Sequence, residues 1–434
     1  MVADHQGRGH QGRIDPDALI DGPERRLICV DSSCIPWQDR TLNSNGVFLF
    51  LLEHHGKELL ARHAVSVPAG VFVPLNGDVA SYSPPAGPLV IKAQVAAGGR
   101  GKAGAIQRAA SLEEANYIIA RLSGSTVRGR PIHGFRVEQR VDFVHEAYVS
   151  LSVDATEARM RLMVSTDGGI DVEALASQGE ALHSVLAHAQ HLGDAALKLC
   201  AALPAPFRAA LSDAAQRLSE IFVAYEAILL EVNPLFILAD GSWIVGDVKM
   251  VIDDNAIVRQ PAPQALLEQY PDIYPESARK LAHGFDYVEV DPDGEIGLVT
   301  TGAGLSMQLM DELKAQGRRP VNFCDIRSGQ FRGDPARLIA VMRWIVSRPN
   351  VRVVLVNIFA GITDLAEFAR LLVEATAQVP ELRVPIIARL IGRNLEEAIG
   401  ILRASDRSVT VEPDLDRAIE LTLATLDAQG VRRG

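Results

Sequence analysis

The spacing of hydrophobic and polar positions changes once along the chain, and this change predicts two domains. Up to about residue 260, runs such as "FRVEQRV", "HEAYVSLSVDA" and "RMRLMVST" alternate apolar with polar residues, as antiparallel strands with one buried face do. Beyond about residue 285, short β-branched runs alternate with amphipathic helices. We therefore predict an α+β domain over residues 46–260, a proline-rich linker over 261–285 and an α/β domain over 286–434.

Several stretches of the first domain have clear ends. The run from Val47, "VFLFLLEHHGKELLARH", predicts a helix that ends near His63, followed by a turn and a strand. The run "GPLVIKAQV" predicts a strand. In "SLEEANYIIARL", Ser111 precedes Glu114 by three residues, which predicts a capping box at the start of a helix. The runs "AILLEVNPLFIL" and "SWIVGDVKMVID" predict two strands joined by the turn "ADG".

The second domain has the pattern of a doubly wound sheet. Its apolar runs "EIGLVT", "PVNFCDI", "VRVVLVNIF", "VPIIARL" and "SVTV" predict five parallel strands, which suit a flavodoxin-like order. The predicted helices between and after these strands cover residues 306–317, 335–347, 365–377, 395–403 and 415–428. Sheets of this kind bind ligands at the carboxyl ends of their strands.

Composition restricts the functional classes. The 434 residues are 48% hydrophobic and carry a net charge of −11, which argues against non-specific binding to nucleic acid or to an anionic membrane. Four cysteines without a CxxC pair favour neither a disulfide framework nor a zinc site. No apolar run reaches 18 residues and the N-terminus has no apolar segment, so we expect a cytoplasmic protein. The polar, glycine-rich residues 1–45 are expected to form a flexible extension.

The stretch "IKAQVAAGGRGKAGAI" combines glycines with positive charge. Its glycines allow backbone N–H groups to converge, and Arg100 and Lys102 add charge, a combination suited to phosphate oxygens. Lys92 lies in the preceding apolar run, where a lysine is costly unless it faces an anion or an acid. A flexible basic hairpin tip is the alternative at this point.

Acidic and amide side chains on the predicted strands form a second group of candidates. Antiparallel pairing would bring Asn233 and Asp247 side by side, and their oxygens suit Mg²⁺; Glu231 would face the same side. Glu138 and Glu146 could accept hydrogen bonds from the ribose or adenine of a nucleotide. Ordinary polar strand residues are the alternative for both sets.

Two glycine-rich turns stand at the predicted carboxyl edge of the second domain. "VTTGAGLSM" and "VNIFAGITDLAEF" each predict a strand, a turn and a helix start, which would direct free N–H groups and a helix dipole at an anion. Tight turns that need glycine for their geometry alone are the alternative.

Taken together, these stretches resemble the β subunit of succinyl-CoA synthetase from about Val47 to the C-terminus. "KAQVAAGGRGKAG", "STDGGIDVE", "EVNPL", "GDVKMVIDDNA", "GAGLSMQLMD" and "LVNIFAGI" occur in the family's order. The resemblance implies an ATP-grasp domain followed by a flavodoxin-like CoA-ligase domain.

The resemblance also implies site residues. Those expected at the ATP phosphates are Lys92, Gly99, Arg100 and Gly101, with Lys92 and Arg100 acting in catalysis. Those expected at the nucleoside are Glu138, Val141 and Glu146. Asn233 and Asp247 are expected to bind Mg²⁺. Those expected at the carboxylic acid are Thr301, Gly361, Ile362 and Thr363.

The family's reaction implies a partner. ATP phosphorylates a histidine, the phosphate passes to the acid, and CoA displaces it as a thioester. The histidine and the CoA site belong to the family's α subunit, which no stretch of this chain resembles. We therefore expect a separate α subunit and a small carboxylic acid as partners, and neither nucleic acid nor membrane.

The chain departs from the family in the second domain. The family has asparagine where this chain has Thr301, and "FGG" where it has "FAG". The family has a run of three glycines where this chain reads "IRSGQFRGD". The loop after Gly361 is about two residues shorter than in the family, so Asp364 follows it sooner. Asp334 and Pro335 predict a helix start whose carboxylate would compete with a phosphate, although Arg327 could restore positive charge.

These departures leave three hypotheses open. The chain could belong to a working carboxylate–CoA ligase, whose acid could be succinate or another. It could also be a nucleotide-binding regulatory or scaffold subunit, or an ATP-grasp ligase that joins an acid to an amine. The cationic loop itself predicts that Arg100→Ala weakens ATP binding with little change in the thermal stability of the free chain.

Overall fold

The structure, a computed structural model, describes residues 48–96, 98–169, 182–327, 333–406 and 408–431. The extension predicted over 1–45, the last four residues of "STDGGIDVE" and the centre of "IRSGQFRGD" lie outside the described residues. None of the helices in the described part of the chain is long and apolar enough to span a bilayer.

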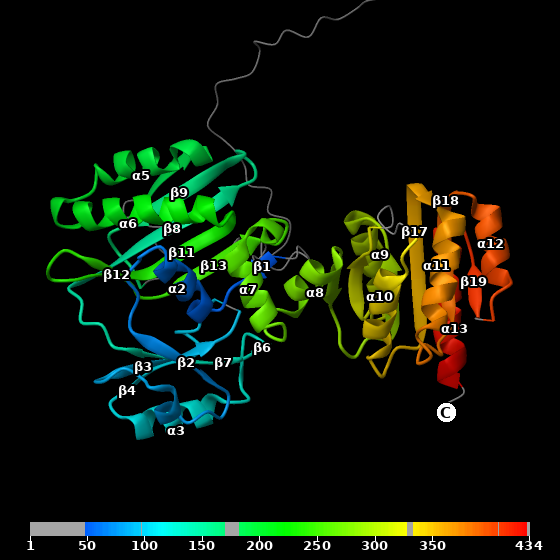
Figure 1. Cartoon of the computed structure of the whole chain (residues 1–434), viewed down its shortest axis with the longest axis horizontal. Helices are drawn as coiled ribbons and strands as arrows, with labels where there is room; N and C mark the ends of the chain where they lie inside the picture. Colours follow the sequence, from blue (N-terminus) through cyan, green and yellow to red (C-terminus); the bar gives the residue numbers. More distant parts are fainter. Residues whose placement is uncertain (1–47, 97, 170–181, 328–332, 407, 432–434) are drawn as a thin grey trace, which may run out of the picture. The chain divides into compact units, whose positions relative to one another are not determined.

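The first domain contains a seven-stranded antiparallel sheet in the order β1-β13-β11-β8-β9-β10, with β12 paired to β11. Its strands are β1 (Phe48–Phe50), β8 (His145–Asp154), β9 (Arg159–Ser165), β10 (Leu182–Ala187), β11 (Ala227–Ile237), β12 (Trp243–Val245) and β13 (Val248–Asp253). Helices α5 (Leu192–Cys200) and α6 (Ala205–Ala224) cover one face of this sheet (Figure 1). Their buried side chains join those of the strands in one core cluster.

A smaller antiparallel sheet has the order β2-β7-β3-β4. Its strands are β2 (Gly70–Pro74), β3 (Leu89–Gln94), β4 (Ile106–Ala109) and β7 (Gly134–Gln139); β5 (Thr126–Val127) and β6 (Arg130–Pro131) form a short hairpin. Helix α3 (Leu112–Leu122) packs on this sheet and begins as predicted: the Ser111 hydroxyl accepts a hydrogen bond from the Glu114 N–H at 3.2 Å. The serine half of the predicted capping box is therefore confirmed, whereas the Glu114 carboxylate accepts from the Ala110 N–H at 2.8 Å, one residue before the N-cap.

Two predicted elements of the first domain are corrected. The helix predicted from Val47 begins only at Glu53, as α2 (Glu53–Arg62), because the residues before it form β1 and pair with β13. The strand predicted over "SWIVGDVKMVID" breaks at Gly246. A β-carbon on Gly246 would lie 2.6 Å from a ring carbon of Phe236, so this break requires glycine.

The predicted linker is mostly helical. It contains α7 (Pro261–Gln269) and α8 (Pro275–His283), each with proline in its first turn, where the missing N–H costs nothing. Leu266, Leu267 and Tyr274 are buried in the core cluster of the first domain, so the first half of this segment is packed structure. The domain boundaries themselves stay predictions.

The second domain has the predicted flavodoxin-like strand order. A parallel sheet runs β15-β17-β18-β19, and β16 lies beside β15 with β14 antiparallel to it. The strands are β14 (Asp286–Glu289), β15 (Ile296–Thr300), β16 (Asn322–Asp325), β17 (Val353–Asp364), β18 (Ile386–Arg393) and β19 (Val409–Val411). The Asn322 side chain joins β16 to β15, because it donates to the Leu298 carbonyl at 2.8 Å and accepts from the Leu298 N–H at 2.9 Å.

Helices cover both faces of this parallel sheet. They are α9 (Ala303–Ala315), α10 (Ala336–Val346), α11 (Leu365–Ala377), α12 (Leu395–Arg403) and α13 (Leu415–Val431). Neighbouring strand residues point to opposite faces: Leu298 packs in one cluster with α9 and α13, and Val299 packs in another with α10, α11 and α12. The prediction of a doubly wound sheet is therefore confirmed.

Candidate active site

The glycine-rich loop joins β3 to β4 and is held in a tight turn. The Ala105 N–H donates to the Arg100 carbonyl at 3.0 Å. Gly99 has φ +73°, and a β-carbon there would lie 2.9 Å from the Arg128 guanidinium, so both conformation and space favour glycine. A β-carbon on Gly101 would meet no atom within 4 Å, so the space beside the loop is open.

Lys92, on β3 before this loop, is buried among acceptors. Its ammonium lies 2.8 Å from Glu53 Oε1 and 2.6 Å from Glu138 Oε1, and it donates to the Gly246 carbonyl at 2.5 Å. Lys92 therefore has two acidic partners, where the sequence predicted an anion or an acid. The break between β12 and β13 supplies the third acceptor.

Arg100, in the loop, is 7% exposed and binds two carboxylates. It donates to Asp247 Oδ1 at 2.5 Å and Oδ2 at 2.7 Å, and it lies 2.8 Å from Glu53 Oε2. A third contact, to the Ala93 carbonyl at 3.2 Å, fixes the guanidinium against β3. Alanine at this position would leave buried carboxylates with fewer partners. We therefore replace the prediction of little stability change in Arg100→Ala by an expected loss.

Sequence reasoning missed three charged residues of this site. Glu53 and Lys57 lie one turn apart on α2, with their charged atoms 2.7 Å apart, and Arg136 on β7 contacts Glu138 at 2.7 Å. Lys57 has no exposed surface and also donates to Glu138 at 2.8 Å. A charged pair four residues apart inside the apolar run "LLEHHGKELL" was the available sign.

We call these seven residues the ion cluster; its members are Glu53, Lys57, Lys92, Arg100, Arg136, Glu138 and Asp247. With four cations and three carboxylates, the cluster carries an excess of positive charge. Burial raises the pKa of Glu53, but the charges of Lys57, Lys92 and Arg100 outweigh it and hold that pKa well below its usual range. Burial likewise raises the pKa of Glu138, and Lys92 and Lys57 bring it below the usual value. Both carboxylates are therefore ionised at neutral pH.

The three candidates for nucleoside contact lie in different environments. Glu138 is 2% exposed, and both its oxygens contact cations of the ion cluster. Val141 is half-buried in the connection between β7 and β8. Glu146 is half-buried on β8, close enough to Gly169 that a β-carbon there would lie 2.2 Å from its Oε2, and burial raises its pKa. Their contact with a nucleoside stays a prediction.

The two candidate metal ligands are neighbours, as predicted. The Asn233 N–H donates to the Asp247 carbonyl at 3.2 Å, and Asn233 Oδ1 accepts from the Gly169 N–H at 2.7 Å. Among the described residues, no group of three or more histidine, cysteine or carboxylate side chains is arranged to hold a metal. One amide and one carboxylate oxygen are of the kind that binds an Mg²⁺ sharing its shell with phosphates and water. The metal would have to take these oxygens from the Gly169 N–H and the Arg100 guanidinium.

Thr301 ties together the carboxyl ends of two strands of the second domain. Its N–H donates to the Asn357 carbonyl at 3.2 Å, and its hydroxyl accepts from the Phe359 N–H at 3.2 Å. It is 8% exposed and precedes the start of α9, where Gly302 has φ +82°. Thr301 is thus held at the edge where this fold class binds ligands.

The second glycine-rich turn differs from the prediction. Gly361, Ile362 and Thr363 continue β17 up to Asp364, and the pairing with β18 shifts register on the way. The Asp364 carboxylate accepts from the N–H groups of residues 366 and 367 at 2.9 and 3.3 Å and from the Asn394 amide at 2.7 Å. The expectation of free N–H groups in the first turn of α11 is therefore wrong for these two groups. Contact of the three loop residues with an acid stays a prediction.

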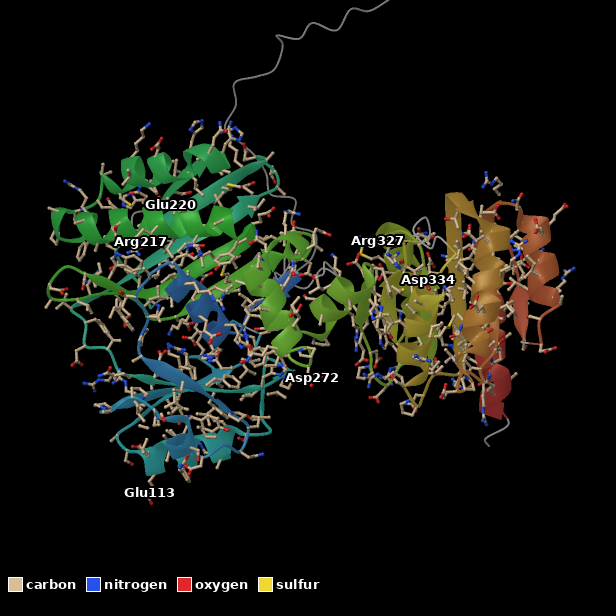
Figure 2. The ribbon with its side chains drawn as sticks, viewed as in Figure 1. Glu113, Arg217, Glu220, Asp272, Arg327 and Asp334 are labelled. Carbon is tan, nitrogen blue, oxygen red and sulfur yellow. The ribbon has the colours of Figure 1, made fainter. Side chains whose placement is uncertain are left out.

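Arg327 and Asp334 lie near the two ends of the stretch "IRSGQFRGD" (Figure 2). Asp334 accepts from the Ala336 N–H at 2.9 Å, although the N-cap of α10 is Pro335, one residue later than predicted. Arg327 donates to Asp286 at 2.8 Å, and Lys280 contacts the same carboxylate at 2.9 Å. Arg327 is therefore paired within the domain with a carboxylate that it shares with Lys280.

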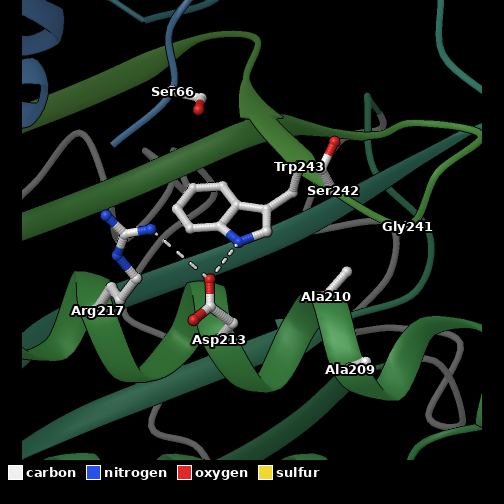
Figure 3. A pocket seen from close by; sticks show the side chains of 8 residues that line it. All are labelled: Ser66, Ala209, Ala210, Asp213, Arg217, Gly241, Ser242 and Trp243. Carbon is white, nitrogen blue, oxygen red and sulfur yellow. Dashed lines mark hydrogen bonds and ion pairs between the residues drawn. The ribbon is translucent and has the colours of Figure 1, made fainter. Parts of the chain in front are cut away.

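A surface pocket of about 320 Å³ lies beside α6 (Figure 3), and none of the candidates above is among its lining residues. Its polar groups bind one another: Trp243 Nε1 donates to Asp213 at 2.8 Å, and Arg217 lies over the indole and donates to the Ala64 carbonyl at 2.8 Å. These contacts fasten α6 to β12 and to the segment after α2.

Comparison with known proteins agrees with this architecture. The ATP-grasp domain family matches residues 50–237 and the CoA-ligase family matches residues 299–422. The ADP-forming succinate–CoA ligase β subunit of Desulfurococcus amylolyticus is 33% identical over 377 residues, which cover 85% of this chain and 97% of that protein. The chain belongs to the succinate–CoA ligase β-subunit family. It is a subunit of an ADP-forming acid–thiol ligase.

Other members and one solved structure support this assignment. The ADP-forming succinate–CoA ligase β subunit of Chloroflexus aurantiacus is 34% identical over 369 residues, 82% of this chain and 93% of that protein. The ATP citrate lyase of Methanothrix soehngenii, solved with citrate and coenzyme A, superposes with a TM-score of 0.69 at 19% identity. The superposition covers 87% of this chain and 100% of the lyase chain, and this likeness supports the fold described above. Membership of this ligase family implies the use of ATP and a divalent metal.

Proposed function

We propose that this β subunit binds Mg²⁺-ATP at the ion cluster and passes phosphate, through a phosphohistidine of a partner α subunit, to a small carboxylic acid that becomes an acyl-CoA. Lys92, Arg100 and the backbone of the loop at Gly99 and Gly101 would contact the phosphates. Asn233 and Asp247 would hold Mg²⁺. Glu138, Val141 and Glu146 would lie at the nucleoside.

One observation carries the proposal: Lys92 and Arg100 lie together, beside Asp247, at an open glycine loop. Both contact the single carboxylate of Glu53, so their charged groups converge on one place. The open space at Gly101 would admit phosphate oxygens to the backbone. When bound, Mg²⁺ would offset the negative charge of the phosphates.

The chemistry asked of this chain is positioning and charge stabilisation. Phosphoryl transfer gains most from fixed cations around the transferring group. Contacts to Glu53, Asp247 and the Ala93 carbonyl fix Arg100 in place before any ligand binds. The second domain would contribute Thr301 and the backbone of residues 361–363 to the acid. An acid other than succinate is favoured by Thr301 and by the early Asp364.

The first experiment is labelling of the native complex. The chain is purified with its partners and incubated with γ-labelled ATP and Mg²⁺. Acid-labile, base-stable phosphate on a co-purifying chain supports the phosphohistidine route, and a panel of dicarboxylates with CoA then identifies the acid. If no acid yields an acyl-CoA, the ligase proposal fails. An amide product would show an amine acceptor in place of CoA.

A regulatory role is the second candidate. It is favoured by Asp334 and Asp364, whose carboxylates occupy N–H groups at the starts of α10 and α11. Binding of ATP without any labelled partner, and without thioester, would support it. ATP-dependent thioester formation would exclude it.

A further inference from the structure

We propose that Glu53 is a positioning residue that orients the two phosphate-binding cations, which makes helix α2 part of the nucleotide site. The inference rests on the proposed function, in which Lys92 and Arg100 contact the phosphates of ATP. Glu53 lies in the first turn of α2 and is 3% exposed. It acts through other residues.

The carboxylate of Glu53 is shared between the two cations. Oε1 lies 2.8 Å from the Lys92 ammonium, and Oε2 lies 2.8 Å from the Arg100 guanidinium. Among the contacts of the described residues, Glu138 binds Lys92 and Asp247 binds Arg100, whereas Glu53 binds both. Glu53 therefore sets the separation of two groups that come from a strand and from the loop after it.

Glu53 is itself held rigidly. Lys57, one turn further along α2, contacts Glu53 Oε1 at 2.7 Å and also donates to the Gly246 carbonyl at 2.8 Å. A buried side chain on a helix, with Oε1 hydrogen-bonded to Lys92 and Oε2 in ionic contact with Arg100, keeps a single rotamer better than one on a loop. The rigid helix thus supplies the reference position for Lys92 on β3 and for Arg100 in the glycine loop.

The roles of Glu53 and Asp247 differ once a metal is considered. In the proposed function Asp247 binds Mg²⁺, so part of its hold on Arg100 is given up to the metal. Glu53 has no such second role and continues to hold both Lys92 and Arg100. It is then the carboxylate that keeps the two cations aimed at the phosphates.

A positioning role and a simple charge effect predict opposite results for Glu53→Gln. The substitution removes one negative charge from the ion cluster, so charge alone predicts tighter binding of the polyanion ATP. Loss of positioning predicts weaker binding, because Lys92 and Arg100 then lose a shared charged acceptor. Adenosine has no phosphate, so its Kd should not respond to either effect. A change in the Kd of adenosine would indicate general damage to the site.

The test is calorimetric titration of the full chain with ATP in the presence of Mg²⁺, and separately with adenosine. We expect Glu53→Gln to raise the Kd of ATP about tenfold, or about 1.4 kcal/mol, and to leave the Kd of adenosine unchanged. Glu58→Gln, an exposed site on the same helix, is the matched control and should change neither. An unchanged or lower Kd of ATP, or an equal loss for adenosine, would overturn the proposal.

A second variant covers the case in which Glu53→Gln does not fold. Glu53→Asp keeps the charge but withdraws the carboxylate from the two cations. In a folded protein it should still raise the Kd of ATP and spare adenosine, and an unchanged Kd of ATP would overturn the proposal. If the unmodified chain binds no ATP, the proposed function itself fails; if it binds ATP and both variants match it, only the role of Glu53 fails.

Discussion

Replacing Lys57 with methionine tests whether the ion cluster stabilises the first domain. Lys57 has no exposed surface, and its ammonium contacts Glu53 at 2.7 Å and both Glu138 and the Gly246 carbonyl at 2.8 Å. Methionine has a similar shape, so it leaves little cavity, but it removes one cation from two buried carboxylates.

The size of the expected stability loss depends on which cations still contact Glu53 and Glu138 in the variant. Removing one partner of a buried ion pair costs roughly 3–5 kcal/mol. Glu53 retains Lys92 and Arg100, and Glu138 retains Lys92 and Arg136. We therefore expect the lower end of that range, about 3 kcal/mol less free energy of unfolding at neutral pH.

The assay is urea unfolding followed by the fluorescence of Trp243, which packs in the core of the first domain. A background with Trp37→Phe and Trp344→Phe leaves Trp243 as the only tryptophan. Lys198→Met, at an exposed position of α5, should stay within about 0.5 kcal/mol of its parent. A deficit below about 1 kcal/mol in Lys57→Met would refute the reasoning, because the buried charges would then not depend on this lysine.

Lowering the pH should reduce the difference in the free energy of unfolding between the unmodified chain and Lys57→Met. In the unmodified chain the pKa values of Glu53 and Glu138 are held below their usual range, so their stabilising contribution is present at neutral pH. That contribution is lost as the pH falls through the lowered pKa values. Lys57→Met raises both folded-state pKa values, so the variant loses less on acidification.

Four further substitutions test the structure. Burial raises the pKa of Asp254 to about 7, so this one group should lower the free energy of unfolding by up to about 4 kcal/mol as the pH rises from about 4 to 7. Urea unfolding at each pH should show that Asp254→Asn removes this contribution. Gly246→Ala should destabilise by about 2 kcal/mol, because its β-carbon would lie 2.6 Å from Phe236, whereas Gly400→Ala, in open space on α12, should stabilise by roughly 0.5–1 kcal/mol. Arg100→Ala should both lower the melting temperature of the free chain and raise the Kd of ATP; an unchanged melting temperature would count against its buried pairs with Glu53 and Asp247.

The architecture of the second domain could be predicted because each of its elements carries a local pattern. Helix α12 spans Leu395–Arg403, the same residues that the sequence predicts, and α11 agrees equally well. The right-handed strand–helix–strand connections of such sheets leave only a few possible strand orders. The predicted start of the first helix was wrong because a continuous apolar run is compatible with a strand and with a buried helix. Only the pairing with β13 decides that Phe48–Phe50 is a strand.

The candidate site could be predicted only where its residues share a motif. The glycine loop keeps Arg100 within eight residues of Lys92, so both are visible in one stretch. Glu53 is 39 residues from Lys92, and Lys57 is 189 residues from the Gly246 carbonyl that it binds. Such contacts depend on how two sheets and α2 pack, and no local spacing encodes them.

The helix starts of the second domain restrict how an acid could be bound. Asp334 accepts from the first turn of α10, and Asp364 accepts from two N–H groups of α11. An anionic ligand at either place would displace a carboxylate that is already bound and would be repelled by it. In the ligase proposal the acid must therefore find donors elsewhere at this edge. Thr301 and the backbone of residues 361–363 are the candidates that the sequence supplies, which is why the choice of acid, and not the binding of ATP, is where this chain should differ from its relatives.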